Sequence, residues 1–207
     1  MYRKWMVKMD LLQSVLQSAE GVDVAILLFI QEHLRFGPLS TFFSAFTHLG
    51  DYGFLWIVIG IALMFPRKTR RAGALALVCM SLGAVVVNVF LKPQVLRIRP
   101  YEAYEAIIPL IGPQIDESFP SGHASAAFCS AFIYLKTLRR PYGALMMVLA
   151  SLIAFSRLYV GVHYPTDVLG GILVAAVVSA VLLILFGTNS YGEVREKKGR
   201  GIKRRGR

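Results

Sequence analysis

The amino-acid sequence predicts an all-α integral membrane protein, a helical bundle with five to six transmembrane helices and amphipathic or interfacial helices at its N-terminal end. Of its 207 residues, 56% are hydrophobic and 17% are charged, whereas soluble domains average about 45–50% apolar and about 25% charged residues. The apolar residues form long uncharged runs, and lysines and arginines gather at the ends of these runs and in the C-terminal tail. This pattern is typical of membrane-spanning helices, and the length fits one domain.

Residues 1–50 form the predicted N-terminal region of interfacial or re-entrant helices. The runs at 11–19 and 22–34 are apolar but short, and charged residues such as Asp23 and Glu32 interrupt them. Residues 38–49 are amphipathic, with phenylalanine and leucine side chains near helical spacing. We expect these helices to pack against the bundle at the membrane surface. The alternative is a sixth spanning helix within residues 22–34. The first ten residues have no apolar core before a small-residue cleavage site, so we expect no cleaved signal peptide.

Five further apolar runs form the predicted transmembrane core, residues 51–187. A spanning helix needs about 20 mostly apolar residues, with about 17 as the lower limit. The first run requires a few residues from before Asp51 to reach that length, whereas the second is full length and is interrupted only by Ser81 and Asn88. The five runs are residues 52–66, 72–91, 121–135, 141–155 and 168–186.

The basic loops assign one orientation to these helices. Loops rich in lysine and arginine face the cytoplasm. Such loops follow the first run (67–71) and the third run (136–140), and the tail carries eight basic residues between Arg195 and Arg207. All three fall on the same side, so we expect a multi-pass protein of the plasma (cytoplasmic) membrane with a cytoplasmic tail. We predict that the tail, residues 188–207, is disordered. The net charge of +11 is thereby assigned to membrane topology, and we expect no nucleic-acid partner.

Three short polar clusters fall on the opposite, outer face under this topology. They lie at the end of the second helix, at the start of the third, and between the fourth and fifth. A histidine, an aspartate or a cation at a membrane boundary is by itself an ordinary interface residue, but the clusters combine three cations with two histidines and a carboxylate. The clusters are Lys92 with Arg99-Pro100, then Pro120-Ser121-Gly122-His123, then Ser156-Arg157 with His163 and Asp167.

The cations and the helix start suit a phosphate group. Arg99 and Arg157 each offer a planar fork to phosphate oxygens, and Lys92 offers a point charge. Ser121 and Gly122 open a helix, where the first backbone N–H groups have no partner inside the helix. Gly122 lets a phosphate approach that backbone closely. An ordinary turn and N-cap would explain the Pro-Ser-Gly segment taken alone.

The histidines suit acid–base and nucleophilic chemistry. His163 and Asp167 are four residues apart and share one face of a helix or of its first turn. A carboxylate bonded to one ring nitrogen leaves the other nitrogen free as a nucleophile. His123 lies two residues into the third helix, where it can serve as a general acid. These residues alone leave open which histidine attacks.

The motif order and spacing resemble the three-part motif of the type 2 phosphatidic acid phosphatase family, which shares its site with vanadium-dependent haloperoxidases. Six residues separate Lys92 from Arg99, five separate Arg157 from His163, and three separate His163 from Asp167. No motif position departs from the family pattern. The resemblance covers residues 92–167, and the flanking helices fit the helical bundle of that family.

The resemblance implies a role for each matching residue. His163 would attack phosphorus and form a phosphohistidine, Asp167 would orient it, and His123 would protonate the departing oxygen. No metal and no cofactor is needed in that scheme, and Cys79 and Cys129, both in apolar runs, indicate neither a disulfide framework nor a metal site. The phosphate oxygens would be held by Lys92, Arg99, Ser121, Gly122 and Arg157.

The expected partner is a lipid phosphate in the bilayer. By family likeness the first choice is undecaprenyl pyrophosphate, cleaved to undecaprenyl phosphate on the outer face, because the chain is compact and its site faces outward. Phosphatidic acid and phosphatidylglycerophosphate are the alternatives. A vanadate-dependent haloperoxidase and a non-enzymatic anion-binding membrane protein are further hypotheses. The sequence does not indicate the oligomeric state. The acidic residues between the second and third helices are expected to be solvated loop charges: Glu102, Glu105, Asp116 and Glu117.

Overall fold

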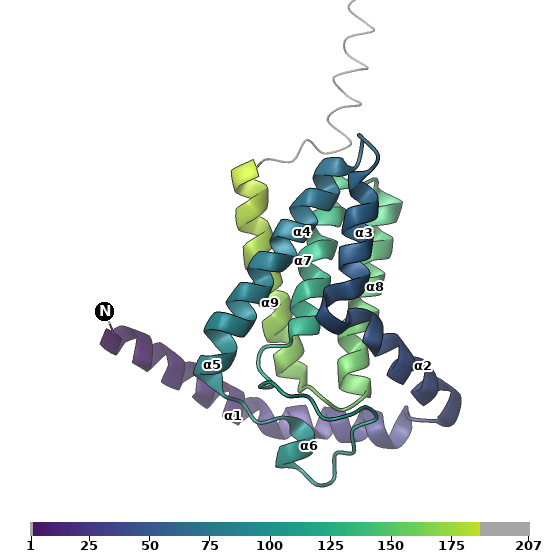
Figure 1. Cartoon of the computed structure of the whole chain (residues 1–207). Helices are drawn as coiled ribbons and strands as arrows, with labels where there is room; N and C mark the ends of the chain where they lie inside the picture. Colours follow the sequence, from purple (N-terminus) through teal and green to yellow (C-terminus); the bar gives the residue numbers. More distant parts are fainter. Residues whose placement is uncertain (1, 187–207) are drawn as a thin grey trace, which may run out of the picture.

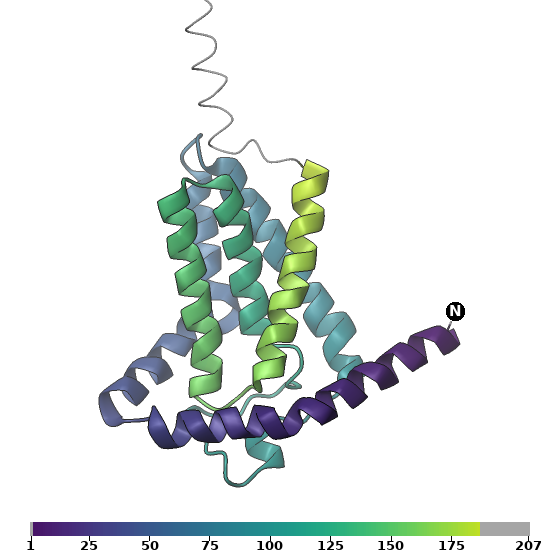
Figure 2. The same ribbon diagram turned by 180° about the vertical axis from the view of Figure 1, so that it is seen from behind.

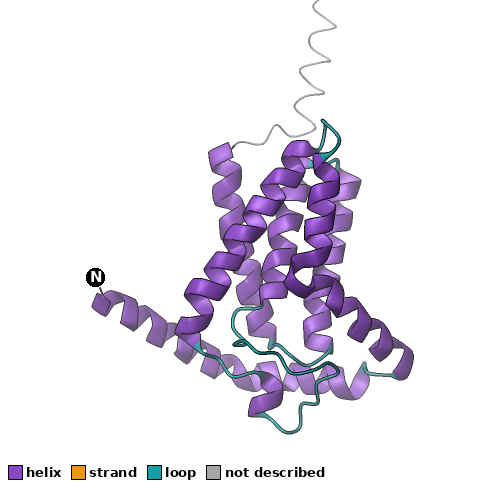
Figure 3. Cartoon of the chain, viewed as in Figure 1, coloured by secondary structure: helices purple, strands orange, loops and turns teal. Residues whose placement is uncertain are grey.

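The computed structural model describes residues 2–186, with side-chain surroundings from residue 12 onward, and its regular structure there is helical (Figure 3). The predicted basic tail, residues 188–207, lies outside the described residues. The helices are α1 (Tyr2–His33), α2 (Gly37–Thr47), the 3₁₀ helix η1 (His48–Gly53), α3 (Phe54–Met64), α4 (Arg70–Val85), the π-helix η2 (Val86–Leu91), α5 (Lys92–Val95), α6 (Pro100–Ala103), α7 (Gly122–Thr137), α8 (Arg140–Tyr159) and α9 (Pro165–Phe186).

Helices α3, α4, α7, α8 and α9 run side by side and form the bundle (Figure 1). Helix α7 lies in the middle and packs against α4, α8 and α9. Small side chains make this close packing possible, because Ala124, Ala127 and Ala131 are fully buried and let neighbouring helices approach. The all-helical membrane bundle predicted from the sequence is confirmed.

Five helical stretches among the described residues are long and apolar enough to cross a membrane. They are Leu12–His33, Gly37–Met64, Arg70–Ala103, Arg140–Tyr159 and Pro165–Phe186. Three of them contain the predicted runs 72–91, 141–155 and 168–186, and Gly37–Met64 covers residues 52–64 of the run 52–66. The fifth predicted run, 121–135, is α7, which has 16 residues. It is shorter than α8 and α9, which have 20 and 22 residues, and it begins deeper in the bundle than α9 does (Figure 1).

A kink separates α2 from α3. Tyr52 has φ of 51° and Gly53 has φ of 72°, so both are in the left-handed region and the helix cannot continue through them. Helix α3 lies in the bundle, whereas α2 slants away from it (Figure 1). The predicted boundary between residues 50 and 51 falls inside η1, at this kink.

The second predicted run continues beyond α4 as a π-helix. Pro93 follows this segment, and its ring excludes the ordinary hydrogen bond to the carbonyl of residue 89. The wider turn of η2, Val86–Leu91, accommodates the proline without ending the helix. The chain therefore stays helical up to Val95 and delivers Lys92 to the end of the bundle.

Helix α1 is one continuous helix that crosses the end of the bundle (Figure 2). The sequence had indicated two short apolar segments in its place. One face packs inward through Leu16, Asp23, Leu27 and Ile30, which are buried. Near its C-terminal end, the Gln31 amide donates to the carbonyl oxygen of Ala106 at 2.9 Å. The placement of residues 1–50 at the membrane surface stays a prediction.

Candidate active site

The three polar clusters predicted from the sequence lie at one end of the bundle, the end that α1 crosses (Figure 1). Helices α5 and α6 bring the first cluster, the start of α7 brings the second, and the turn between α8 and α9 brings the third. The basic loops 65–69 and 138–139 lie at the opposite end. Residues up to 75 positions apart in sequence are thereby assembled in one layer.

Lys92 and Arg99 are almost fully buried, and both bind Asp116 in the loop between α6 and α7. Arg99 donates from Nη2 to Oδ1 of Asp116 at 2.7 Å and from Nε to its backbone oxygen at 2.8 Å, while Lys92 donates to Oδ2. Burial opposes ionisation of Asp116, but the bonds and charges of Lys92 and Arg99 outweigh it and lower the pKa of this carboxyl to about 2. Asp116 is 46% exposed and so is partly solvated, as expected, but it is also paired with two cations, which the sequence did not indicate. A carboxylate bridges the two cations predicted to hold phosphate.

Arg157 is 1% exposed and has two side-chain partners that the sequence did not suggest. Its Nη1 donates to the hydroxyl of Thr47 at 2.8 Å, and its Nη2 donates to the side-chain oxygen of Gln114 at 3.1 Å. Its Nε has no hydrogen-bond partner among the described residues. This guanidinium therefore still has a donor to offer to an anion. A buried donor without a partner costs about 1–3 kcal/mol, and a bound anion would remove that cost.

His163 lies in the turn between α8 and α9 and is 2% exposed. Its Nδ1 is 3.4 Å from Oδ2 of Asp167, and its Nε2 is 3.5 Å from Nη1 of Arg99. Arginine only donates, so Nε2 is the unprotonated nitrogen in this arrangement and Nδ1 carries the proton. Nδ1 faces Asp167 but has no hydrogen-bond partner among the described residues. Burial, reinforced by the cations Arg99, Arg157 and Lys92, holds the pKa of His163 well below its ordinary value. The imidazole is neutral at neutral pH and can serve as a nucleophile.

Asp167 is fully buried in the first turn of α9 and has partners on both oxygens. Oδ1 accepts from Nη1 of Arg97 at 2.7 Å. Oδ2 accepts from the Ser118 hydroxyl at 2.5 Å and from the Tyr164 backbone N–H at 2.8 Å. The sequence reasoning missed Arg97 and Ser118, although each lies two residues before a motif segment. Polar residues adjacent to a motif are the signal that could have indicated them.

The start of α7 has the expected capping geometry. The Ser121 hydroxyl accepts from the Ala124 N–H at 3.4 Å, and the Ser121 N–H donates to the backbone oxygen of Asp167 at 2.9 Å. A Cβ on Gly171 of α9 would lie 2.5 Å from the Ser121 carbonyl oxygen, so glycine is what permits this close approach. No atom of the described residues lies within 4 Å of a Cβ built on Gly122. The space in front of the helix start is open.

His123 follows Gly122 and binds an aspartate that the sequence reasoning missed. Its Nε2 is 2.9 Å from Oδ1 of Asp51, and Oδ2 of the same carboxylate is 2.7 Å from Nδ1 of His48. A Cβ on Gly50 would lie 2.6 Å from Cδ2 of His123, so the backbone of η1 packs directly on the ring. The kink between α2 and α3 therefore brings both Asp51 and this backbone against His123. His48 also has a partner that the sequence did not indicate.

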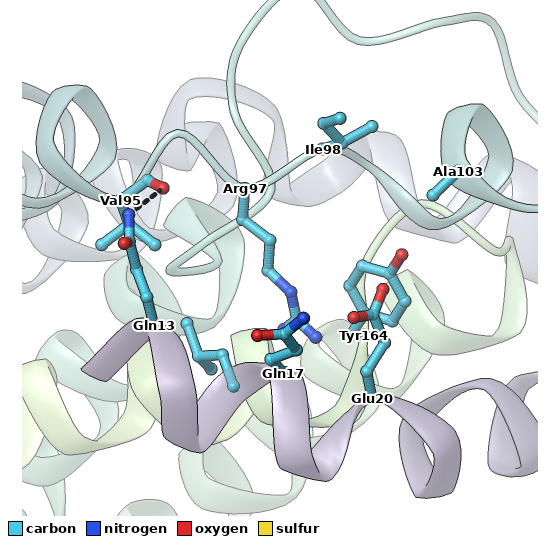
Figure 4. Close-up of a pocket in the computed structure, with 9 residues that line it drawn as sticks. Gln13, Gln17, Glu20, Val95, Arg97, Ile98, Ala103 and Tyr164 are labelled. Carbon is cyan, nitrogen blue, oxygen red and sulfur yellow. Dashed lines mark hydrogen bonds between the residues drawn. The ribbon is translucent and has the colours of Figure 1, made fainter. Parts of the chain in front are cut away.

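A cavity of about 310 Å³ lies between α1 and the segment from α5 to α6 (Figure 4). Its lining includes Gln17 and Glu20 of α1 together with Arg97 and Tyr164. The guanidinium carbon of Arg97 lies 3.9 Å from the centroid of the Tyr164 ring. None of the predicted site residues lines this cavity, which meets the catalytic cluster only through Arg97 and Tyr164.

Hydrogen bonds and short polar contacts join five of the predicted site residues in one network. Lys92 and Arg99 share Asp116, Arg99 reaches His163, His163 faces Asp167, and the Asp167 backbone receives Ser121. The positive charge of Arg157 contributes to lowering the pKa of both His163 and His123. In residues 2–186, no group of three or more His, Cys, Asp or Glu side chains is placed to hold a metal ion.

Comparison with known proteins shows relatives of the same architecture. An undecaprenyl-diphosphatase of Sulfolobus acidocaldarius is 27% identical over 79% of this chain and 80% of its own length. A decaprenylphosphoryl-5-phosphoribose phosphatase of Mycobacterium tuberculosis is 32% identical over 77% of this chain and 88% of its own length. The crystal structure of a transmembrane PAP2-type phosphatidylglycerolphosphate phosphatase from Bacillus subtilis superposes with a TM-score of 0.68 at 29% identity, covering 88% of this chain and 94% of that one.

The family model described as the PAP2 superfamily matches residues 72–191, which is more than half of the chain. That region contains α4 to α9 and the three polar clusters. The network around His163 and the helical bundle that carries it agree with this match. The chain is a multi-pass membrane protein that belongs to the PAP2 superfamily.

Proposed function

We propose that this chain is a membrane lipid phosphatase in which His163 attacks phosphorus. The observation that carries the proposal is the setting of His163: a buried, neutral imidazole with Asp167 beside Nδ1 and an arginine donor facing Nε2. A phosphate bound by Arg99 would lie next to the unprotonated nitrogen. This is the arrangement that nucleophilic catalysis requires.

In the proposed reaction the phosphate oxygens bind Lys92, Arg99 and Arg157, the Ser121 hydroxyl and the backbone N–H of Gly122. Nε2 of His163 forms a bond to phosphorus as the bond from phosphorus to the leaving oxygen breaks. His123, which is protonated when the anionic substrate is bound, gives a proton to that oxygen. Water then attacks the phosphohistidine and gives a proton back to His123, inorganic phosphate leaves, and His163 regains its neutral state. Asp167 stabilises the positive charge that His163 carries while phosphorus is attached.

Charge stabilisation by fixed donors supplies the largest share of the rate. The cations and the start of α7 are in place before substrate arrives, and the side chains of Lys92, Arg99 and Arg157 are buried. Removing one such donor typically costs about 10²–10³ in rate. The scheme needs no metal ion, and its test includes full activity in the presence of a chelator.

The proposed substrate is undecaprenyl pyrophosphate, converted to undecaprenyl phosphate. The Sulfolobus relative carries that activity in its name, and the compact size of the chain supports the same choice. Phosphatidic acid and phosphatidylglycerophosphate are the alternatives, and the phosphatidylglycerolphosphate phosphatase of Bacillus subtilis supports the latter. The site residues bind the phosphate group, which all of these lipids share. The hydrocarbon part of the lipid therefore decides which of them is the substrate.

The proposed orientation places the site at the outer face of the plasma membrane. Its support is the position of the basic loops, which lie at the end of the bundle opposite the site. Labelling of single cysteines by a reagent that does not cross membranes tests this: a cysteine in loop 104–121 should react in intact cells, and one in loop 65–69 should not.

The deciding experiment is phosphate release from several lipids by the purified protein in detergent. Undecaprenyl pyrophosphate should give the highest kcat/KM, and phosphate from ³²P-labelled lipid should be trapped as an acid-labile, alkali-stable phosphoenzyme. His163→Ala should abolish both signals while leaving the protein folded. Normal turnover by His163→Ala would refute the nucleophile assignment. Halide oxidation by the vanadate-loaded protein would support a haloperoxidase instead, and phosphate binding without release would support an anion-binding protein.

A further inference from the structure

Helix α1 contributes a buried carboxylate close to the catalytic cluster. Asp23 is 2% exposed, although it lies on a helix with many exposed residues. Its Oδ1 accepts from the Thr166 backbone N–H at 3.0 Å, and its Oδ2 accepts from Nη2 of Arg97 at 2.9 Å and from the Thr166 hydroxyl. Buried charges persist in proteins where they are paired and hydrogen-bonded, and Asp23 meets that condition only through residues at the catalytic end.

Arg97 connects this carboxylate to Asp167. Its Nη1 donates to Oδ1 of Asp167 at 2.7 Å and to the Thr166 hydroxyl at 2.7 Å, while its Nη2 binds Asp23. The Tyr164 ring lies against its guanidinium. Figure 4 shows Arg97 extending from the loop between α5 and α6 toward α1. A planar guanidinium held on two sides in this way cannot move without releasing Asp167.

The net charge of these three residues faces His163 on the side opposite the cations Arg99, Arg157 and Lys92. Asp23 and Asp167 each carry one negative charge and Arg97 carries one positive charge, so the buried group as a whole is negative. If Asp23 were neutral, the charge of Arg97 would cancel that of Asp167. His163 becomes positively charged as it attacks phosphorus, and cations lie on one side of it. Without a net negative charge on the other side, that positive charge would be less stabilised.

We propose that Asp23 of α1 is a positioning residue, which acts through Arg97 to hold Asp167 against His163 and to keep that side of the site negative. This inference rests on the proposed function of His163 and Asp167. It makes α1 part of the catalytic unit, although α1 lies outside residues 72–191 that match the superfamily. The helix supplies a charge as well as a cover for the end of the bundle.

The experiment compares Asp23→Asn with wild type in kcat, in KM for the lipid and in inhibition by orthovanadate. Asparagine keeps the shape and removes the charge. We expect kcat to fall about tenfold, which is the factor that corresponds to a change of one pKa unit in a single group. KM and the inhibition constant should change less than twofold, because Asp23 touches none of the phosphate-binding residues. Glu20→Gln, which removes a carboxylate one turn earlier on α1 beside Tyr104, is the matched control and should keep wild-type kcat.

A double variant separates a charge effect from a loss of packing. In Asp23→Asn combined with Arg97→Gln, the positive charge of Arg97 is gone, so the buried group again has a net negative charge, and the glutamine amide can still donate to Asp167. We expect kcat of the double variant to exceed that of Asp23→Asn alone. A double variant that is equally or more impaired, or an Asp23→Asn variant with unchanged kcat or with a raised KM, overturns the proposal.

Folding is checked by thermal unfolding of each variant in the same detergent. If Asp23→Asn does not fold, Asp23→Glu, which keeps the charge, is measured instead. It should retain more than half of the wild-type kcat. A fall in the kcat of Asp23→Glu as large as that of Asp23→Ala counts against the proposal. Failure of the proposed function is a separate outcome, since it appears in the wild-type protein as missing phosphoenzyme or as activity that survives His163→Ala.

Discussion

Nε2 of His123 lies 2.9 Å from Oδ1 of Asp51, a residue at the kink between α2 and α3. The bond joins the start of α7 to a segment 72 positions earlier in the chain. The proposed general acid is therefore held by a carboxylate that no motif contains. This relation leads to a prediction about the leaving group.

His123→Ala should reduce kcat far more for a lipid monophosphate than for p-nitrophenyl phosphate. An alkoxide leaves only with a proton, whereas p-nitrophenolate leaves without one, and general acid catalysis is worth about 10²–10⁴ in rate. Asp51→Asn should show the same selective loss at a smaller size. His48→Gln, which removes only the outer partner of Asp51, should keep the wild-type ratio of the two substrates. Equal losses on both substrates would contradict the acid role of His123.

Asp116→Asn should strengthen inhibition by inorganic phosphate and orthovanadate. The Asp116 carboxylate binds Lys92 and Arg99, so an entering anion must displace it. A neutral amide competes less, and the inhibition constants should fall by roughly twofold to fivefold, because a half-exposed ion pair is worth up to about 1 kcal/mol. Glu105→Gln, with the same charge change on the exposed part of the loop, should leave them unchanged. Weaker inhibition of Asp116→Asn would mean that Asp116 helps to arrange the cations.

Gly122→Ala should fold normally and still lose activity. No described atom lies within 4 Å of the added methyl group, and alanine favours a helix more than glycine does. The methyl would occupy the space through which phosphate reaches the first N–H groups of α7, and a displacement of about 1 Å at a reacting centre can cost about 10²-fold in rate. Unfolding temperature and kcat/KM are the two measurements. Gly112→Ala meets equally open space in the loop and should change neither.

His163 should remain neutral through the physiological range in the free protein. Its pKa is held well below the ordinary value of about 6.5 by burial and then by Arg99, Arg157 and Lys92. A lowered pKa means that the imidazole protonates only at more acidic pH, so its NMR signal, assigned with His163→Gln, should not titrate between pH 8 and pH 6. A midpoint for His163 near 6.5 would show that the cations do not act on it.

The sequence predicted the bundle and the residues of the three clusters because their signals are local. Apolar runs of spanning length, basic loops and the Lys92, Ser121 and His163 segments can each be read within a few residues. The carboxylates Asp23, Asp51 and Asp116 could not be assigned in the same way. Each is a single acidic residue whose partners come from elsewhere in the chain, 72 and 74 positions away for Asp51 and Asp23.

Two features of the backbone were also outside local reasoning. The left-handed conformation of Tyr52 redirects the chain, but tyrosine rarely adopts it and nothing in its neighbours except Gly53 suggests it. The path of α1 across the bundle depends on which of its faces is buried, and its apolar residues alone fit a spanning helix equally well. Both depend on tertiary packing, which a periodic pattern does not determine.

The shortness of α7 has a consequence for the energy of substrate entry. Sixteen residues make a helix of about 24 Å, whereas the 22 residues of α9 make about 33 Å. The start of α7 is thus recessed within the bundle relative to the start of α9 (Figure 1). A lipid can bring its phosphate to that depth while its hydrocarbon chain stays among its neighbours. Pulling the chain out into water would cost about 0.8 kcal/mol per CH₂ group, which for a long isoprenoid is far more than binding could return.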